Sequence, residues 1–187
     1  MKRTDLLATA VIAAAMVGGM APVDRAMAQE TFADTRAVIE FQRTVDAYAF
    51  MHRQVERRIG LAHRHTGEPV DVIAAGELAA GIIAERPRPA LLFTPAVVAM
   101  FRNAALSALR DGCDAGELRT GVWELSHDPY TPAAGSRPVS PCMVSALPEL
   151  PDELEYRSAG TVLLLVDHHA NLVVDVLPAL LAGSDIR

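Results

Sequence analysis

The sequence predicts an α+β domain in which three helices are followed by a long disulfide-clipped loop and a C-terminal β-hairpin or three-stranded meander. Three observations support this fold class. Apolar residues recur at helical spacing in the first part of the chain, prolines crowd residues 111–151, and two strand-like runs follow. Both cysteines lie near the edges of the proline-rich stretch, where a disulfide would close the loop.

The first 28 residues have the layout of a secretory signal peptide. Two basic residues precede an apolar run from Leu6 to Met20, and residues 26–28 offer the small residues that a signal peptidase needs. The run is shorter than the ~20 residues that span a bilayer. We therefore expect cleavage after Ala28, a single globular domain over residues 29–187, no membrane span after signal removal, and a periplasmic or secreted location.

The chain that remains after cleavage is acidic. Seventeen basic and 23 acidic residues in the full sequence become 14 and 21, which gives a net charge of −7. An acidic domain without a basic stripe binds the phosphate backbone of nucleic acids poorly, so we expect no nucleic-acid partner. The only lysine is Lys2, so the mature chain has no Schiff-base chemistry.

The first predicted helix covers residues 34–60. Asp34 suits its N-terminal cap and Gly60 its end. Alternating spacings of three and four place seven residues on one stripe, which we expect to be buried. These residues are Val38, Phe41, Val45, Tyr48, His52, Val55 and Ile59.

Two shorter helices are predicted over residues 70–85 and 94–110. The former lies between Pro69 and Pro87. Its expected apolar face is made of Ile73, Gly76, Ala80 and Ile83, and Gly76 would allow close packing against the first helix. The latter has the clearest boundaries, with Thr94 as cap, Pro95 in the first turn and Gly112 after the last turn.

Residues 111–151 show no regular period and contain six of the twelve prolines, so we expect an irregular loop. A β-hairpin is expected over about residues 155–177, with strands at 161–166 and 172–177 and a candidate third strand at 155–158. Val162, Leu164 and Val166 would occupy one face and Leu163 and Leu165 the other. Apolar side chains on both faces predict a sheet that is covered on both sides or joins a partner.

Cys113 and Cys142 are the only cysteines, and an exported chain matures where thiols are oxidised. We therefore predict a disulfide between them. The alternative is a nucleophilic thiol assisted by His127 or His52.

Histidines provide the candidate metal ligands. Two local clusters, His63 with His65 and His168 with His169, could contribute imidazoles, although neither has the helical spacing typical of a metal site. Their alternative role is as surface histidines in turns. His52 lies on the apolar stripe of the first helix, so we interpret it as a hydrogen-bonded core histidine rather than a ligand.

Trp123 and Tyr130 are the candidate binding residues, because rigid aromatic loops make good recognition surfaces. Alternatively, Trp123 fills the core of the domain. The edge of the hairpin could recruit a protein partner or a second copy of the chain.

No catalytic residues are assigned and no cofactor is predicted. Residues 126–128 (Ser-His-Asp) are neighbours in sequence, and neighbours rarely converge into a triad. No G-x-S-x-G elbow is present. The sequence thus favours a non-enzymatic exported module that binds a protein or a ligand. A histidine-based metal-binding protein and an unrecognised hydrolase are the two alternatives.

Three segments resemble a group of small exported bacterial proteins of unknown function. They are Leu147-Pro-Glu-Leu-Pro-Asp-Glu-Leu-Glu-Tyr-Arg157, the stretch Asn171-Leu-Val-Val-Asp175, and Phe93-Thr94-Pro95 before the third helix. The resemblance implies export and an order of helices followed by a hairpin. It implies no activity, cofactor or catalytic residue.

Overall fold

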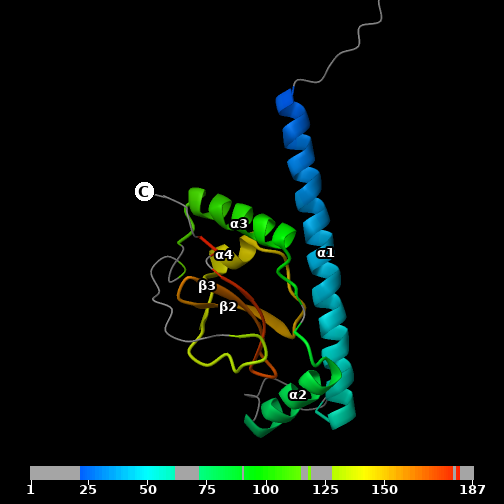
Figure 1. Ribbon diagram of the computed structural model, residues 1–187. Coiled ribbons are helices and arrows are strands. Elements are labelled where there is room, and N and C mark those ends of the chain that lie inside the picture. The colour runs from blue at the N-terminus through cyan, green and yellow to red at the C-terminus, as the bar shows by residue number, and fades with distance from the viewer. Residues whose placement is uncertain are drawn as a thin grey trace, which may run out of the picture.

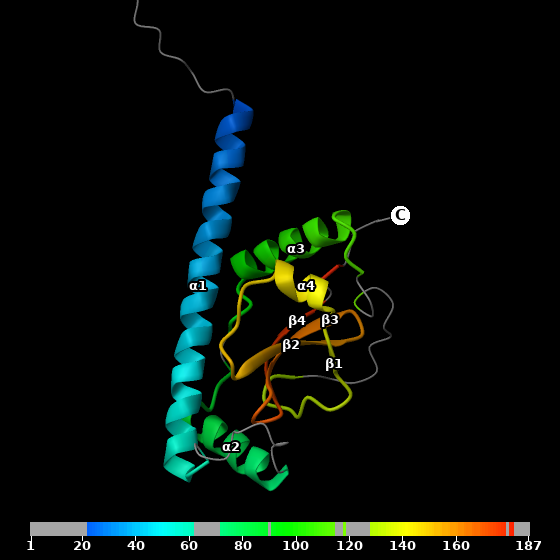
Figure 2. The same ribbon diagram turned by 180° about the vertical axis from the view of Figure 1, so that it is seen from behind.

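Helices come first and an antiparallel sheet last in the computed structural model, which confirms the α+β prediction (Figure 1). The structure describes residues 22–61, 72–89, 91–114, 118, 128–178, 180 and 181, and side chains from residue 34 on. The elements in chain order are α1 (Pro22–Ile59), α2 (Val72–Glu85), α3 (Pro95–Arg110), β1 (Arg137–Pro138), α4 (Pro141–Ala146), β2 (Leu154–Ala159), β3 (Val162–Asp167) and β4 (Leu172–Leu177). Viewed from behind, α1 runs along one side of the body, and α3 and α4 lie over one end of the sheet (Figure 2).

Helix α1 begins earlier than the sequence indicated. It starts at Pro22, and a proline suits the first turn, so the prediction of a cap at Asp34 is wrong and Asp34 lies inside the helix. The expected signal cleavage after Ala28 would fall within this helix. The predicted end is confirmed: Gly60 has φ +75°, and the Leu61 N–H donates to the carbonyl of Glu56.

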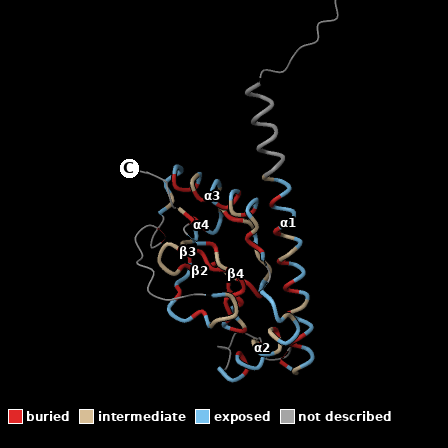
Figure 3. The backbone as a smooth tube through the Cα atoms, viewed as in Figure 1, coloured by how far each residue is buried: buried red, intermediate tan, exposed pale blue. Residues whose placement is uncertain are grey.

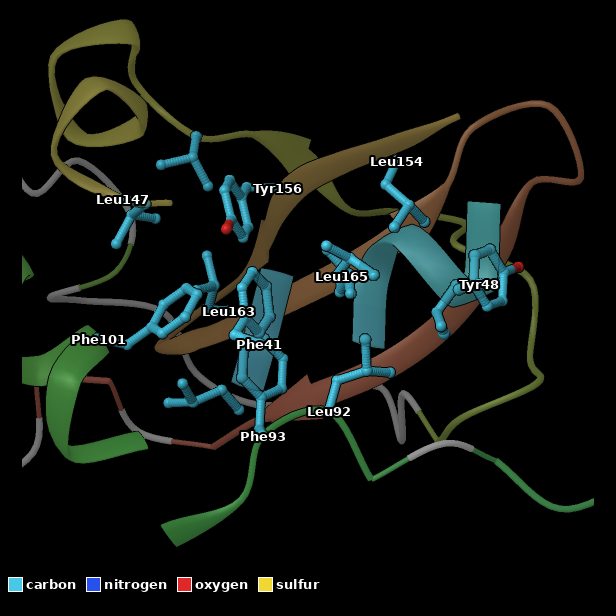
Figure 4. Packing of buried hydrophobic residues seen from close by; sticks show 14 of the residues in the cluster. Phe41, Tyr48, Leu92, Phe93, Phe101, Leu147, Leu154, Tyr156, Leu163 and Leu165 are labelled. Carbon is cyan, nitrogen blue, oxygen red and sulfur yellow. The ribbon is translucent and has the colours of Figure 1, made fainter. Parts of the chain in front are cut away.

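The apolar stripe of α1 forms one wall of the core, as the burial pattern shows (Figure 3). Phe41 and Tyr48 are fully buried, and Phe41 packs between the rings of Phe93 and Phe101 (Figure 4). Val38 was expected to be buried but is 39% exposed, and Ala37 contacts the core in its place.

Helix α2 packs against α1 through a different face from the one predicted. The buried residues of α2 are Ala74, Ala75, Leu78 and Ile82. Ile73, which was expected to be buried, is 71% exposed. The predicted close approach at Gly76 is also wrong, because no heavy atom lies within 4 Å of a Cβ built there. A Cβ at Gly81 would lie 2.6 Å from Val55 Cγ1, so Gly81 is where the two helices meet closely.

Helix α3 confirms its sequence signals. The Thr94 side chain accepts a hydrogen bond from the Val97 N–H, and Pro95 occupies the first turn. The Cys113 N–H donates to the carbonyl of Ala108 beyond a left-handed Gly112, which ends the helix. Cys113 forms the predicted disulfide with Cys142, so the alternative of a nucleophilic thiol is excluded.

Residues 111–151 are less irregular than expected. They contain the short helix α4 and the two-residue strand β1. Ser140 caps α4 by accepting a hydrogen bond from the Met143 N–H, and Pro141 occupies its first turn. The disulfide therefore joins the end of α3 to the start of α4.

The four strands pair antiparallel in the order β1-β2-β3-β4. The expected third strand is β2, which turns into β3 through Gly160, whose φ is +58°. Every residue of β3 is buried. Its side chains divide between two clusters as predicted: Leu163 and Leu165 face the helices, and Val162, Leu164 and Val166 form a second cluster with Val173.

Residues 130–138 pass from one edge of the sheet to the other. The Tyr130 N–H donates to the carbonyl of Val173, at the outer edge of β4. Ala133 packs into the second cluster, and Arg137 then pairs with Ser158 of β2. This segment covers part of both sheet edges. Among the helices of the described residues, none has the length and apolar character needed to cross a membrane.

Candidate metal centre

Two side chains of the candidate site lie on the last turns of α1. His52 and Glu56 are four residues apart, so both project from the same face of the helix toward the sheet. His52 is fully buried and Glu56 is 7% exposed. The helix end at Gly60 fixes this turn, because the backbone carbonyl of Glu56 accepts the closing hydrogen bond from Leu61.

The turn between β3 and β4 contributes the third side chain, His169. Asp167 ends β3, and its Oδ1 accepts a hydrogen bond of 2.8 Å from the Ala170 N–H. This bond closes the turn, and Asn171 leaves it with φ +47°, which asparagine tolerates. The turn places the His169 ring 5.3 Å from the His52 ring, measured between centroids.

Asp167 also orients His52. Its Oδ2 lies 2.5 Å from His52 Nδ1 and accepts a hydrogen bond of 2.8 Å from the Tyr48 hydroxyl. A carboxylate only accepts hydrogen bonds, so Nδ1 of His52 carries a proton. The other ring nitrogen, Nε2, is thereby directed at Glu56. A carboxylate that holds the far nitrogen of a histidine is a recurrent arrangement in metal sites.

Three ligand-type atoms converge at this point. His52 Nε2 lies 2.9 Å from Glu56 Oε1. His169 Nδ1 lies 3.3 Å from the same oxygen and 3.4 Å from His52 Nε2. Bonds of about 2.0–2.1 Å to a tetrahedral ion place its ligands about 3.3–3.4 Å apart. Two of the three separations match that value, and the third is shorter because His52 and Glu56 contact each other directly.

The charges of this cluster favour a positive occupant. Burial alone lowers the pKa of His52, but the hydrogen bonds and negative charges of Asp167 and Glu56 outweigh this effect and raise it above 6.5. Burial and the neighbouring Asp167 raise the pKa of Tyr48, which keeps the phenol neutral and able to donate. One protonated imidazole offsets one of the two carboxylates, whereas a divalent cation bound to neutral His52 would offset both.

A partly buried ion pair flanks the cluster. Arg53 Nη1 lies 2.5 Å from Glu153 Oε1, and this contact ties α1 to the start of β2. The Glu153 carbonyl accepts a hydrogen bond from the His168 N–H, so the same residue supports the turn that carries His169. Within the described part of the chain, the second carboxylate oxygen of Glu153 is buried without a hydrogen-bond partner.

The residues predicted from the sequence are only partly brought together. His169 belongs to the cluster, whereas the exposed His168 directs Nε2 toward the carbonyl of Asp152 at 2.6 Å. His63, His65 and Trp123 lie outside the described residues. The hydroxyl of Tyr130 donates to the carbonyl of Arg86, so this side chain holds the segment after α2.

The sequence interpretation of His52 was incomplete. The structure confirms a buried, hydrogen-bonded histidine, but it also places Nε2 of the ring among ligand-type atoms of Glu56 and His169. The only local signal was the spacing of four residues between His52 and Glu56, which is equally typical of a simple ion pair on a helix.

Comparison with protein-family models, with curated proteins and with solved structures found no match to this chain. The candidate site therefore rests on its own geometry.

Proposed function

We propose that this protein is an exported metal-binding protein that holds one divalent transition-metal ion between His52, Glu56 and His169. The convergence of two imidazole nitrogens and one carboxylate oxygen within 4.8 Å of one another supports this proposal. The sequence already offered a metal-binding protein as one alternative. The ligands proposed here differ from those expected from the sequence, because His52 and Glu56 join His169.

The donor set indicates which ions fit. Imidazole nitrogen with one carboxylate suits Zn²⁺ and its neighbours in the first transition row, whereas sites without thiolate or thioether ligands are poor for Cu⁺. Three protein ligands also leave room for a fourth ligand from solvent. We therefore choose Zn²⁺ as the probe ion and Co²⁺ as its spectroscopic substitute.

Export is part of the same proposal. It is supported by the signal-like first 28 residues and by the Cys113–Cys142 disulfide, because disulfides persist mainly in oxidising compartments. The periplasm and the cell exterior both satisfy these observations.

Metal binding is preferred here to docking at the hairpin edge. Residues 130–133 already donate to and accept from β4, so part of the edge that a partner strand would use is occupied. His52 Nε2 and Glu56 Oε1 are 2.9 Å apart, so a bound cation would replace this direct contact.

The test is isothermal titration of the full chain with Zn²⁺ after chelator treatment. We expect one ion per chain. We expect His169→Ala to weaken binding by at least about 100-fold, because loss of a residue that only hydrogen-bonds to a metal ligand already lowers metal affinity 10–100-fold. The matched control is His168→Ala, which removes the adjacent imidazole, whose ring packs 4.3 Å from that of His169 between centroids, but none of the three proposed ligand atoms.

Absence of Zn²⁺ binding, or an equal loss in both single variants, would overturn the proposal. The double variant H63A/H65A tests the ligands first expected from the sequence. A loss of binding there, with His169→Ala unaffected, would replace the proposed ligand set.

A further inference from the structure

A second site lies apart from the candidate metal centre, on the segment that joins β1 to β2. Helix α4, residues 147–150 and strands β1 and β2 line an open pocket of about 500 Å³. Pockets of this size hold small molecules in other proteins. The pocket lining includes none of His52, Glu56 and His169, so the pocket shares no residue with the candidate metal centre.

The walls of this pocket are mainly apolar. Leu147 and Tyr156 lie beside each other in the packing view (Figure 4). The hydroxyl of Tyr156 donates to the carbonyl of Pro148, so the ring presents carbon rather than a free donor. Val144 is 39% exposed, so this part of the wall is open to solvent. The apolar lining comprises chiefly Val139, Val144, Leu147, Leu150, Leu154 and Tyr156.

The charged groups of the lining are both carboxylates. Glu155 forms an ion pair with Arg157, with 2.9 Å between Oε1 and Nη1. Glu149 is exposed and forms no hydrogen bond or ion pair in the described part of the chain. No basic residue lines the pocket. A ligand with an apolar body and a positive group therefore complements it, whereas a carboxylate or phosphate group would meet repulsion.

We propose that this pocket binds a small aliphatic amine, with the alkyl chain against Leu147 and Tyr156 and the ammonium group beside Glu149. A partner strand is a poorer occupant, because Pro138 of the adjacent edge strand has no N–H to donate to it. The proposal is independent of metal binding and carries its own test.

The test compares three ligands with the same chain length: octylamine, octanol and octanoate. Each is titrated into the isotopically labelled full chain at pH 7, and binding is followed by the amide NMR signals of residues 139–156. We expect octylamine to bind about two- to five-fold more tightly than octanol, the range typical of an exposed charge pair, and octanoate to bind weakest. All three should shift the signals of Val144 and Leu147.

Two variants separate the contributions. Glu149→Gln should remove the preference for octylamine and leave octanol binding unchanged. The matched control is Asp152→Asn, which neutralises an exposed acidic residue on the same segment but outside the pocket, and which should keep the preference. Val144→Trp, which fills the open wall, should weaken all three ligands.

Equal affinities for the three ligands would overturn the proposal, as would a preference that survives Glu149→Gln. Shifts confined to residues outside 139–156 would also overturn it. A short peptide, acetyl-Leu-Lys-amide, is titrated as the fourth ligand. Tighter binding of this peptide than of octylamine would assign the pocket to a polypeptide and reject the small amine.

Discussion

Asp167 contacts His52 across 115 residues of sequence, with 2.5 Å between Oδ2 and Nδ1. The same carboxylate closes the turn that carries His169, through Oδ1 and the Ala170 N–H. One side chain therefore sets the position of both histidines of the candidate site, although it is not itself in the cluster of ligand-type atoms.

Replacement of Asp167 by Asn should weaken Zn²⁺ binding by about 10–100-fold, because the variant no longer holds His52 Nδ1–H with a charged acceptor. Titration calorimetry measures the affinity, and the visible spectrum of the Co²⁺ form reports the ligand geometry. Asp175→Asn is the control, since Asp175 is a buried aspartate of β4 that caps the Leu92 and Phe93 N–H groups away from the site. Equal losses of Zn²⁺ affinity in the two variants would show that Asp167 contributes only to stability.

The raised pKa of His52 predicts how stability changes with pH in the metal-free protein. The folded state holds this proton more tightly than the unfolded chain, whose histidine has its ordinary pKa of 6.5. The stabilisation is therefore complete below pH 6.5 and is lost as the pH rises through the pKa of the folded state. Urea unfolding in the presence of a chelator, at a series of pH values from 6 upward, should show the free energy of unfolding decreasing.

His52→Gln should flatten this pH dependence, while His168→Gln should leave it unchanged. Both variants lack one histidine, but only the first removes the group between Asp167 and Glu56. An identical slope in wild type and His52→Gln would contradict the assignment.

The contact between Gly81 and Val55 predicts opposite effects at the two interior glycines of α2. Gly81→Ala places a Cβ 2.6 Å from a buried β-branched side chain, so it should destabilise the protein by about 1–3 kcal/mol. Gly76→Ala meets no atom within 4 Å and should stabilise by about 0.5–1 kcal/mol through helix propensity. Thermal unfolding measures both, and a lower melting temperature for Gly76→Ala would refute this packing.

Loss of the Cys113–Cys142 disulfide should be costly. The bridge spans 29 residues, and the chain-entropy model assigns about 3–4 kcal/mol to a loop of that length. The double variant C113S/C142S should unfold at correspondingly lower urea concentration. Intact mass under non-reducing conditions verifies the bridge in the wild type, and two free thiols in the exported protein would contradict it.

N-terminal sequencing of protein recovered from the periplasm or the medium tests export. We expect Gln29 as the first residue, because residues 26–28 carry the cleavage pattern. A product that retains Met1 would argue against a cleaved signal.

Local chemical signals predicted much of the fold. Thr94 with Pro95, Gly60 and Gly112 marked helix ends through backbone requirements that few other residues meet. The prediction of which face of α2 is buried failed for the opposite reason. The sequence of α2 is almost entirely apolar, so no polar side fixes which face turns inward. Helix α4 has six residues, too few to show a period, although Ser140 and Pro141 carry cap and first-turn signals that could have located it.

Local sequence patterns could not predict most of the candidate site. Asp167 and His169 reach His52 only because β3 and β4 fold back against the end of α1, and no spacing in the sequence encodes that contact. The sequence did identify His169 as a candidate ligand, but it grouped this residue with its neighbour His168, whose ring packs against His169 while its Nε2 contacts the carbonyl of Asp152.

The proposed ligands are far apart in the sequence, with His52 and His169 separated by 117 positions. During synthesis the helix leaves the ribosome long before the last hairpin exists, so a nascent or truncated chain holds at most the His52 and Glu56 half of the site. Zn²⁺ uptake would then report that folding has reached completion, and a chaperone-bound precursor would remain metal-free until the final turn closes.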